Sequence, residues 1–176
     1  MNNNKYSYNI LNQKLVNKKN KKIISYCLFG IGSTRDLMRN YYDGIFVNYN
    51  LAKTIYPDWI CRVYIDSNVS KDKIDELYKL NNLEIIIIET NIPFMCVRFL
   101  PFDDTDVDIW ISRDLDSIIS LREKQAVDEW LLSTKNMHIM HDHKHHIQLI
   151  LAGMFGIKNS FLFNFLNEIN NYNNVF

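Results

Sequence analysis

Glu84-Ile-Ile-Ile-Ile-Glu89 is the clearest indication of fold class in this chain. Isoleucine is β-branched and favours extended backbone, so this run predicts a strand. Because successive side chains of a strand point to opposite faces, four isoleucines in a row make both faces apolar. A strand of that kind is typical of a parallel sheet that is covered on both sides.

Other predicted strands and helices alternate with this strand along the chain. Strands are predicted at residues 22–29, 62–66, 108–112 and, more briefly, 137–140. Apolar residues at helical spacing predict helices around residues 45–55, 70–78, 122–132 and 161–169. Such alternation indicates βαβ units, which build a parallel sheet between helices. We therefore expect an α/β fold, a three-layer sandwich with a mostly parallel central sheet.

We expect one domain between two polar ends. Residues 1–21 are rich in Asn and Lys and have little apolar periodicity, which predicts a disordered or loosely packed arm. Residues 22–170 carry the predicted strands and helices, and a chain of 176 residues suits a single domain of this kind. Residues 171–176 are expected to form an Asn-rich tail.

Composition argues against several classes of partner. The 20 basic and 20 acidic residues give a formal net charge of +0, so no overall field favours nucleic acid or an anionic membrane. No apolar run is long enough to span a bilayer, and the N-terminus lacks an apolar signal region. The three cysteines are dispersed, as expected of buried thiols in a reducing compartment. We expect a cytoplasmic protein that binds no nucleic acid and does not cross a membrane.

Two carboxylates follow the strand predicted at residues 108–112. The segment reads Asp108-Ile-Trp-Ile-Ser-Arg-Asp-Leu-Asp-Ser117, so Asp114 and Asp116 lie where the strand gives way to a turn. Such a pair can bind one Mg²⁺ or Mn²⁺, since both cations favour carboxylate, water and phosphate oxygens. The alternative is a solvated turn, because an Asp-x-Asp triplet also occurs by chance.

Other candidate residues lie near the ends of predicted strands, where open α/β sheets bind their ligands. Gly30 is expected in a turn near a nucleotide, although Arg35 stands where a Gly-x-Gly-x-x-Gly fingerprint needs its third glycine. Asp66 ends the second strand and either reaches a base or ribose or caps a turn. Arg98 and Arg113 flank the motif strand and either stabilise a leaving diphosphate or pair with surface acids.

Several segments together form a pattern that is typical of one family. They are Ser25-Tyr-Cys-Leu-Phe-Gly30, Pro57-Asp-Trp59, Arg98-Phe-Leu-Pro101, Arg113-Asp-Leu-Asp-Ser117, Arg122-Glu-Lys-Gln-Ala-Val-Asp-Glu-Trp130, His138-Ile-Met-His-Asp-His143 and Leu151-Ala-Gly-Met-Phe-Gly156. Over residues 22–158 the chain resembles glycosyltransferase-like proteins of the GT-A fold, of a kind found in large DNA viruses and some microbes. The resemblance implies a UDP- or GDP-sugar donor, a Mn²⁺ or Mg²⁺ cofactor and an acceptor hydroxyl on a glycan, a protein or a small molecule. A viral protein of this kind is expected in the host cytoplasm.

The resemblance also assigns roles to particular residues. Asp114 and Asp116 match the acids that hold the metal on the donor diphosphate, and Asp116 is the expected direct ligand. Asp142 and His143 are expected near the donor sugar, Asp142 as a general base and His143 as a partner of a sugar hydroxyl or of the metal. Gly153 is expected where the backbone approaches the donor closely. An independent zinc site among the neighbouring histidines is the alternative for that loop.

Two positions depart from the pattern of that family. His141-Asp-His-Lys144 stands where the family has Arg-Asp-His-Pro, which removes a guanidinium that could clamp a phosphate. Ala152-Gly153 replaces a Gly-Gly pair, and the chain ends soon after it. The alternative function is therefore a truncated, non-catalytic protein of the same fold that binds a nucleotide or a partner. A nucleotidyltransferase is a further alternative, although the loop after the first strand offers only two glycines and Arg35 for a phosphate.

Overall fold

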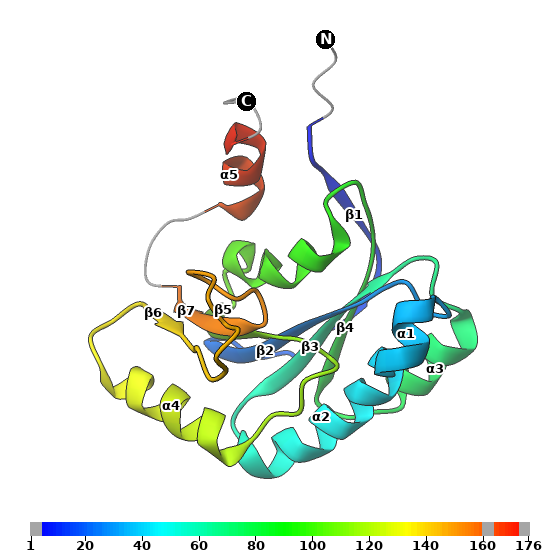
Figure 1. The fold of residues 1–176 in the computed structure, drawn as a ribbon. Helices are drawn as coiled ribbons and strands as arrows, with labels where there is room; N and C mark the ends of the chain where they lie inside the picture. Colours follow the sequence, from blue (N-terminus) through cyan, green and yellow to red (C-terminus); the bar gives the residue numbers. More distant parts are fainter. Residues whose placement is uncertain (1–4, 160–163, 173–176) are drawn as a thin grey trace.

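The computed structural model describes residues 5–159 and 164–172. Within these residues seven strands form one mixed sheet, in the order β1-β4-β3-β2-β5-β7-β6 (Figure 1). The strands are β1 (Tyr8–Lys14), β2 (Lys21–Leu28), β3 (Ile60–Asp66), β4 (Leu83–Thr90), β5 (Val107–Arg113), β6 (Met137–Ile139) and β7 (Met154–Lys158). The central strands β4, β3, β2 and β5 are parallel, whereas β1, β7 and β6 pair antiparallel with their neighbours. The α/β class and the mostly parallel centre of the sheet are thus confirmed.

Helices lie on both faces of this sheet. They are α1 (Thr34–Arg39), α2 (Tyr41–Ile55), α3 (Lys71–Tyr78), α4 (Leu121–Leu132), α5 (Phe165–Tyr172) and the 3₁₀ helix η1 (Phe94–Asp103). Helices α2, α3 and α4 cover one face, and η1 and α5 lie on the other, which gives three layers (Figure 1). The predicted helices near residues 45–55, 70–78 and 122–132 correspond to α2, α3 and α4. Among the described residues, no helix is long and apolar enough to span a membrane.

The isoleucine run of β4 supplies side chains to two separate cores. Leu83 and Ile85 are buried in the core that α2, α3 and α4 cover. Ile86 and Ile88 are buried in a core on the opposite face, together with Val97 of η1. Since alternate residues of a strand point to opposite faces, an uninterrupted apolar run is required when both faces are covered. The double burial inferred from Glu84–Glu89 is therefore confirmed.

The N-terminal segment differs from the expected loose arm. Tyr8–Lys14 forms the edge strand β1, which pairs antiparallel with β4 from Tyr8↔Thr90 to Lys14↔Ile85. Most of its side chains are exposed, but Lys14 Nζ donates to the carbonyl oxygens of Tyr78 (2.9 Å) and Leu80 (2.6 Å). Pairing at a sheet edge is made by the main chain, so it needs no apolar pattern in the sequence. That is why polar composition alone gave the wrong expectation for residues 8–14.

The C-terminal boundary also differs from the expected one. Helix α5 continues to Tyr172, so residues 171 and 172 belong to the helix and not to an Asn-rich tail. Asp103 Oδ1 accepts a hydrogen bond of 2.6 Å from the backbone nitrogen of Phe165, which ties the start of α5 to the end of η1. The first part of the helix predicted at residues 161–169 and the rest of the predicted tail, residues 173–176, lie outside the described residues.

Strand β7 and helices α1 and η1 were not predicted from the sequence. β7 lies between β5 and β6 and is antiparallel to both. It has five residues and contains Gly156, at which an added Cβ would lie 2.7 Å from Ile111 Cγ2 and 3.2 Å from Trp130 Cη2. Glycine is needed there because Ile111 of β5 and Trp130 of α4 both pack closely against this position. A short strand with a central glycine has little strand signal of its own.

The order of the strands creates a crevice at one edge of the sheet. From β2 the chain adds β3 and β4 on one side and then returns to add β5 on the other side of β2. Ser25 of β2 pairs with Ser112 of β5, so the carboxyl ends of these two strands adjoin. In open α/β sheets, ligands bind beyond the carboxyl ends of the strands at the point where the strand order reverses. The topology thus places a candidate ligand site after Leu28 and Arg113.

Candidate functional site

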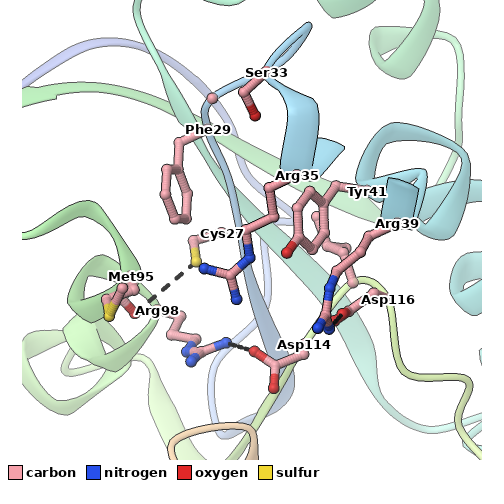
Figure 2. A pocket seen from close by; sticks show the side chains of 12 residues that line it. Cys27, Phe29, Ser33, Arg35, Arg39, Tyr41, Met95, Arg98, Asp114 and Asp116 are labelled. Atoms are coloured by element: carbon pink, nitrogen blue, oxygen red, sulfur yellow. Dashed lines mark hydrogen bonds and ion pairs between the residues drawn. The ribbon is translucent and has the colours of Figure 1, made fainter. Parts of the chain in front are cut away.

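A cavity of about 260 Å³ lies at the point where the strand order reverses (Figure 2). Its lining residues are Cys27, Phe29, Gly30, Ser33, Arg35, Arg39, Tyr41, Met95, Arg98, Asp114, Leu115 and Asp116. Three arginines and two aspartates therefore meet there, giving the cavity a net formal charge of one positive unit. Of the residues predicted to bind metal or cofactor, Gly30, Arg98, Asp114 and Asp116 line this cavity.

Asp114 is the first residue after β5, and Arg98 of η1 forms an ion pair with its Oδ1. The Arg98 side chain is 7% exposed and also donates from Nη1 to the carbonyl oxygen of Arg113, at 3.3 Å. The Asp114 side chain is 43% exposed, so this carboxylate faces both the buried guanidinium and the open cavity. The Asp114 carboxylate is therefore open to the cavity, and the Arg98 guanidinium is fixed behind it.

Gly153 contacts the Asp114 carboxylate from the other side. A Cβ added at Gly153 would lie only 2.6 Å from Asp114 Cγ, so the carboxylate occupies the space of a side chain there. The turn is held by Ser112 Oγ, which donates to the carbonyl oxygen of Ala152 at 2.6 Å. Gly153 was predicted to allow close approach of a donor. The structure instead shows close approach of Asp114, and Gly153 does not line the cavity.

Asp116 is positioned by helix α2. Asn48 is only 1% exposed, and its Nδ2 donates to the carbonyl oxygen of Ser117 at 3.0 Å. Its Oδ1 accepts from the backbone nitrogen of Ile119, also at 3.0 Å. An added Cβ at Gly44 would lie 2.9 Å from the carbonyl carbon of Leu115, so only glycine lets α2 approach the loop this closely. Neither Asn48 nor Gly44 was predicted from the sequence, although Asn48 is a polar residue on the apolar face of a predicted helix.

Helix α1 places two further arginines in the cavity. Arg35 and Arg39 are four residues apart and so share a face of the helix, and Figure 2 shows both side chains extending into the cavity. Arg39 forms an ion pair with Asp116 Oδ2, whereas no acidic side chain of the described residues forms an ion pair with Arg35. In the sequence, Arg35 was noted as a departure from a glycine fingerprint and as the one basic residue that this loop offers to a phosphate, whereas Arg39 was not predicted as a site residue.

The turn before α1 depends on its glycines. Gly30 and Gly32 have φ values of +65° and +81°, which favour glycine because a side chain is strained there. The backbone nitrogen of Gly32 donates to Asp36 Oδ2 at 2.8 Å, and Ser33 Oγ accepts from the backbone nitrogen of Asp36 at 3.2 Å. The turn at Gly30 is thus part of the cavity wall, and it fixes where α1 begins.

Arg113 does not reach the cavity. Its side chain is buried on the opposite side of β5, where Nε forms an ion pair with Glu123 of α4 and Nη1 donates to the carbonyl oxygen of Ser112 at 2.7 Å. Arg113 is the last residue of β5 and its side chain faces α4, whereas Asp114 follows the strand and lines the cavity. The expected contact of Arg113 with a cofactor is therefore replaced by a structural ion pair.

Asp66 caps a turn at the end of β3. Its Oδ1 accepts hydrogen bonds from the backbone nitrogen of Asn68 at 2.9 Å and from Asn68 Nδ2 at 2.8 Å. It does not line the cavity, so of the two readings of this residue the structure shows the turn cap.

Asp142 and His143 also lie outside the cavity. Asp142 borders a separate, open groove beside α4, and its carboxylate lies 2.9 Å from His146 Nδ1 and 3.6 Å from Arg122 Nη1. His143 is exposed, and its Nδ1 accepts from the backbone nitrogen of His145 at 3.2 Å. Neither Asp142 nor His143 therefore lies close enough to the cavity of Asp114 and Asp116 to contact a ligand there.

The metal-ligating side chains of the described residues suit a Mg²⁺ or Mn²⁺ site better than a zinc site. Among the described residues, no group of three His, Cys, Asp or Glu side chains is arranged to hold a metal ion, and this includes the histidine-rich loop. The expected alternative of a zinc site there is not found. Mg²⁺ and Mn²⁺ differ from zinc in this respect, because one or two carboxylates together with substrate phosphates and water suffice to bind them. Asp114 and Asp116 match that requirement.

Cys27 does not add nucleophilic chemistry to the cavity. Burial raises the pKa of the Cys27 thiol to about 12, although the Arg98 guanidinium acts in the opposite direction. The thiolate, not the thiol, is the reactive form, so Cys27 is inert at neutral pH. The charged groups that line the cavity are therefore carboxylates and guanidinium groups.

No known protein family, curated protein or solved structure matches this chain.

Proposed function

We propose that this chain is a metal-dependent glycosyltransferase, which moves a sugar from a nucleoside-diphosphate donor to an acceptor hydroxyl. The observation that carries the proposal is that Asp114 and Asp116 line one cavity at the point where the strand order of the sheet reverses. Ligands of open α/β sheets bind at such points. The resemblance of Arg113–Ser117 and the other motif segments to GT-A glycosyltransferase-like proteins supports the same fold and donor class.

Different residues of the cavity would bind different parts of such a donor. A divalent cation held by Asp114 and Asp116 would neutralise charge that develops on the leaving diphosphate. Arg98, which is already fixed at the back of the cavity, adds positive charge at the same place without needing to reorganise. Phe29 and Tyr41 stand on the cavity wall, where their rings offer apolar surface to a base or a sugar (Figure 2).

A second candidate is a non-catalytic nucleotide-binding protein of the same fold. Two observations favour it. Both aspartates have arginine partners, and Asp142 and His143, the expected catalytic residues, lie away from the cavity. Such a protein would bind the nucleotide without splitting the donor. Slow hydrolysis of the donor to free sugar and nucleoside diphosphate distinguishes the enzyme from it.

The proposal is tested by thermal unfolding with a panel of UDP- and GDP-sugars, each with and without Mn²⁺. A donor at about 100 times its Kd should add about 2.7 kcal/mol to the free energy of unfolding and raise Tm by roughly 5–10 °C. Asp116→Asn should abolish the part of this shift that depends on Mn²⁺. Asp58→Asn, the same change at an exposed turn, is the matched control. If no donor raises Tm of the wild type with Mn²⁺, the proposal is wrong.

A further inference from the structure

The ion pair of Arg98 with Asp114 is buried and fixed by further contacts, whereas that of Arg39 with Asp116 is exposed. Arg98 is 7% exposed, donates to a backbone carbonyl at 3.3 Å and lies with Cζ 5.8 Å from the ring centroid of Phe99. Arg39 is 53% exposed and is the last residue of the short helix α1. Among the described residues, Asp116 is its one hydrogen-bond partner. Arg39 can therefore leave its aspartate without breaking other contacts, whereas Arg98 cannot.

The charges of the cavity indicate when Arg39 should leave. The cavity carries one net positive formal charge. A divalent cation alone would raise this to three, next to guanidinium groups that already occupy its ligands, so binding is unfavourable. The diphosphate of a nucleotide-sugar brings two negative charges, which cancel those of the cation. The two ligands together leave the net charge of the cavity unchanged.

We propose that Arg39 is a movable counter-ion, which neutralises Asp116 until metal and donor arrive together and then transfers to the donor diphosphate. This inference depends on the proposed function, because it requires a cation and a diphosphate at Asp114 and Asp116. Arg35 offers a second guanidinium on the same face of α1, with no acidic partner among the described residues. Metal and nucleotide then bind cooperatively, since each removes the charge penalty of the other.

The test is to measure Mn²⁺ binding by water proton relaxation enhancement, which separates Mn²⁺ on the protein from Mn²⁺ on free nucleotide. Wild type, Arg39→Gln and Arg39→Lys are each titrated alone, with UDP and with GDP. Arg122→Gln is the matched control, because Arg122 is 70% exposed and lies on α4 outside the cavity. Wild type should bind Mn²⁺ about tenfold or more tightly when the preferred nucleotide is present.

The variants separate this inference from the proposed function. Arg39→Gln should bind Mn²⁺ alone severalfold more tightly than wild type, because Asp116 is no longer occupied, and should lose most of the coupling to nucleotide. Arg39→Lys should keep part of the coupling, and Arg122→Gln all of it. If Arg39→Gln matches wild type in both respects while wild type forms the ternary complex, the counter-ion role is wrong and the proposed function stands. If wild type fails to bind Mn²⁺ both in the presence of UDP and in the presence of GDP, the counter-ion role and the proposed function are both wrong.

Discussion

Replacing Asn48 by alanine should loosen the loop that carries both aspartates. The buried amide of Asn48 makes one hydrogen bond of 3.0 Å to each of Ser117 and Ile119, and a longer one of 3.4 Å to Leu115. The variant leaves the carbonyl oxygens of Leu115 and Ser117 and the backbone N–H of Ile119 without these partners, and the Leu115 and Ile119 groups are buried. Each such group costs about 1–3 kcal/mol, so we expect the free energy of unfolding to fall by about 2–4 kcal/mol.

Urea unfolding followed by circular dichroism measures this loss. Asn50→Ala is the matched control, because Asn50 lies on the same helix but is exposed, and within the described residues the one hydrogen bond of its amide is accepted from Lys53 Nζ, at 3.1 Å. Amide hydrogen exchange gives a second readout at the loop itself. The Ile119 N–H should exchange faster in Asn48→Ala than in wild type by more than the global loss of stability explains, because its acceptor is gone.

A stabilising role of Asn48 is excluded if the free energy of unfolding of Asn48→Ala stays within about 0.5 kcal/mol of wild type, the range expected of an ordinary surface substitution. A role of Asn48 in holding this loop is also excluded if the loss of stability is found but the Ile119 N–H stays as protected as in wild type. The first result would mean that the buried hydrogen bonds contribute nothing net. The second would mean that the loop is held by contacts other than those with α2.

Three further predictions concern the surroundings of the site. Gly153→Ala should force the Asp114 side chain aside, since the added methyl would lie 2.6 Å from its Cγ. Mn²⁺-dependent nucleotide binding, measured by calorimetry, should weaken about tenfold or more. Unchanged binding would show that the turn at Gly153 moves instead. Glu123→Ala leaves Arg113 buried without its carboxylate and should lower stability by about 3–5 kcal/mol in urea unfolding, so a loss below about 1 kcal/mol would contradict a structural role for this pair. Burial, with Arg113 nearby, lowers the pKa of His138 to about 4, so the unfolded chain takes up a proton at higher pH than the folded one, and stability should fall as pH drops from about 6.5 to about 4. His138→Phe should flatten that part of the pH profile in thermal unfolding, and an equally steep profile would assign the dependence to other groups.

Local sequence was sufficient wherever one segment determined its own environment. Glu84–Glu89 indicated burial on both faces, and the apolar spacing around Ile45 and Tyr49 indicated α2. β1 could not be found in this way, because an edge strand is held by main-chain hydrogen bonds and its side chains are largely exposed. β7 was missed because it is short and its central glycine serves the packing of α4.

The residues of the candidate site also differ in whether local sequence could identify them. Asp114 and Asp116 were found because two acids directly after an apolar strand form a local pattern. Arg39 and Asn48 act on that loop from positions 77 and 69 residues away along the chain, and neither belongs to a motif. Arg113, Asp142 and His143 were assigned from neighbouring sequence, but the Arg113 side chain faces α4 and the loop around Asp142 lies beside the same helix.

The α/β class, the main strands and helices, and the acid pair that follows β5 could therefore be predicted from the amino-acid sequence, since each of these depends on the chemistry of a few consecutive residues. Which charges share the cavity could not be predicted, because it depends on the packing of distant segments. Electrostatic and hydrogen-bond contacts act over a few ångströms in space, and only the packing of α1, α2 and η1 against the ends of β2 and β5 brings Arg39, Asn48 and Arg98 to the two aspartates.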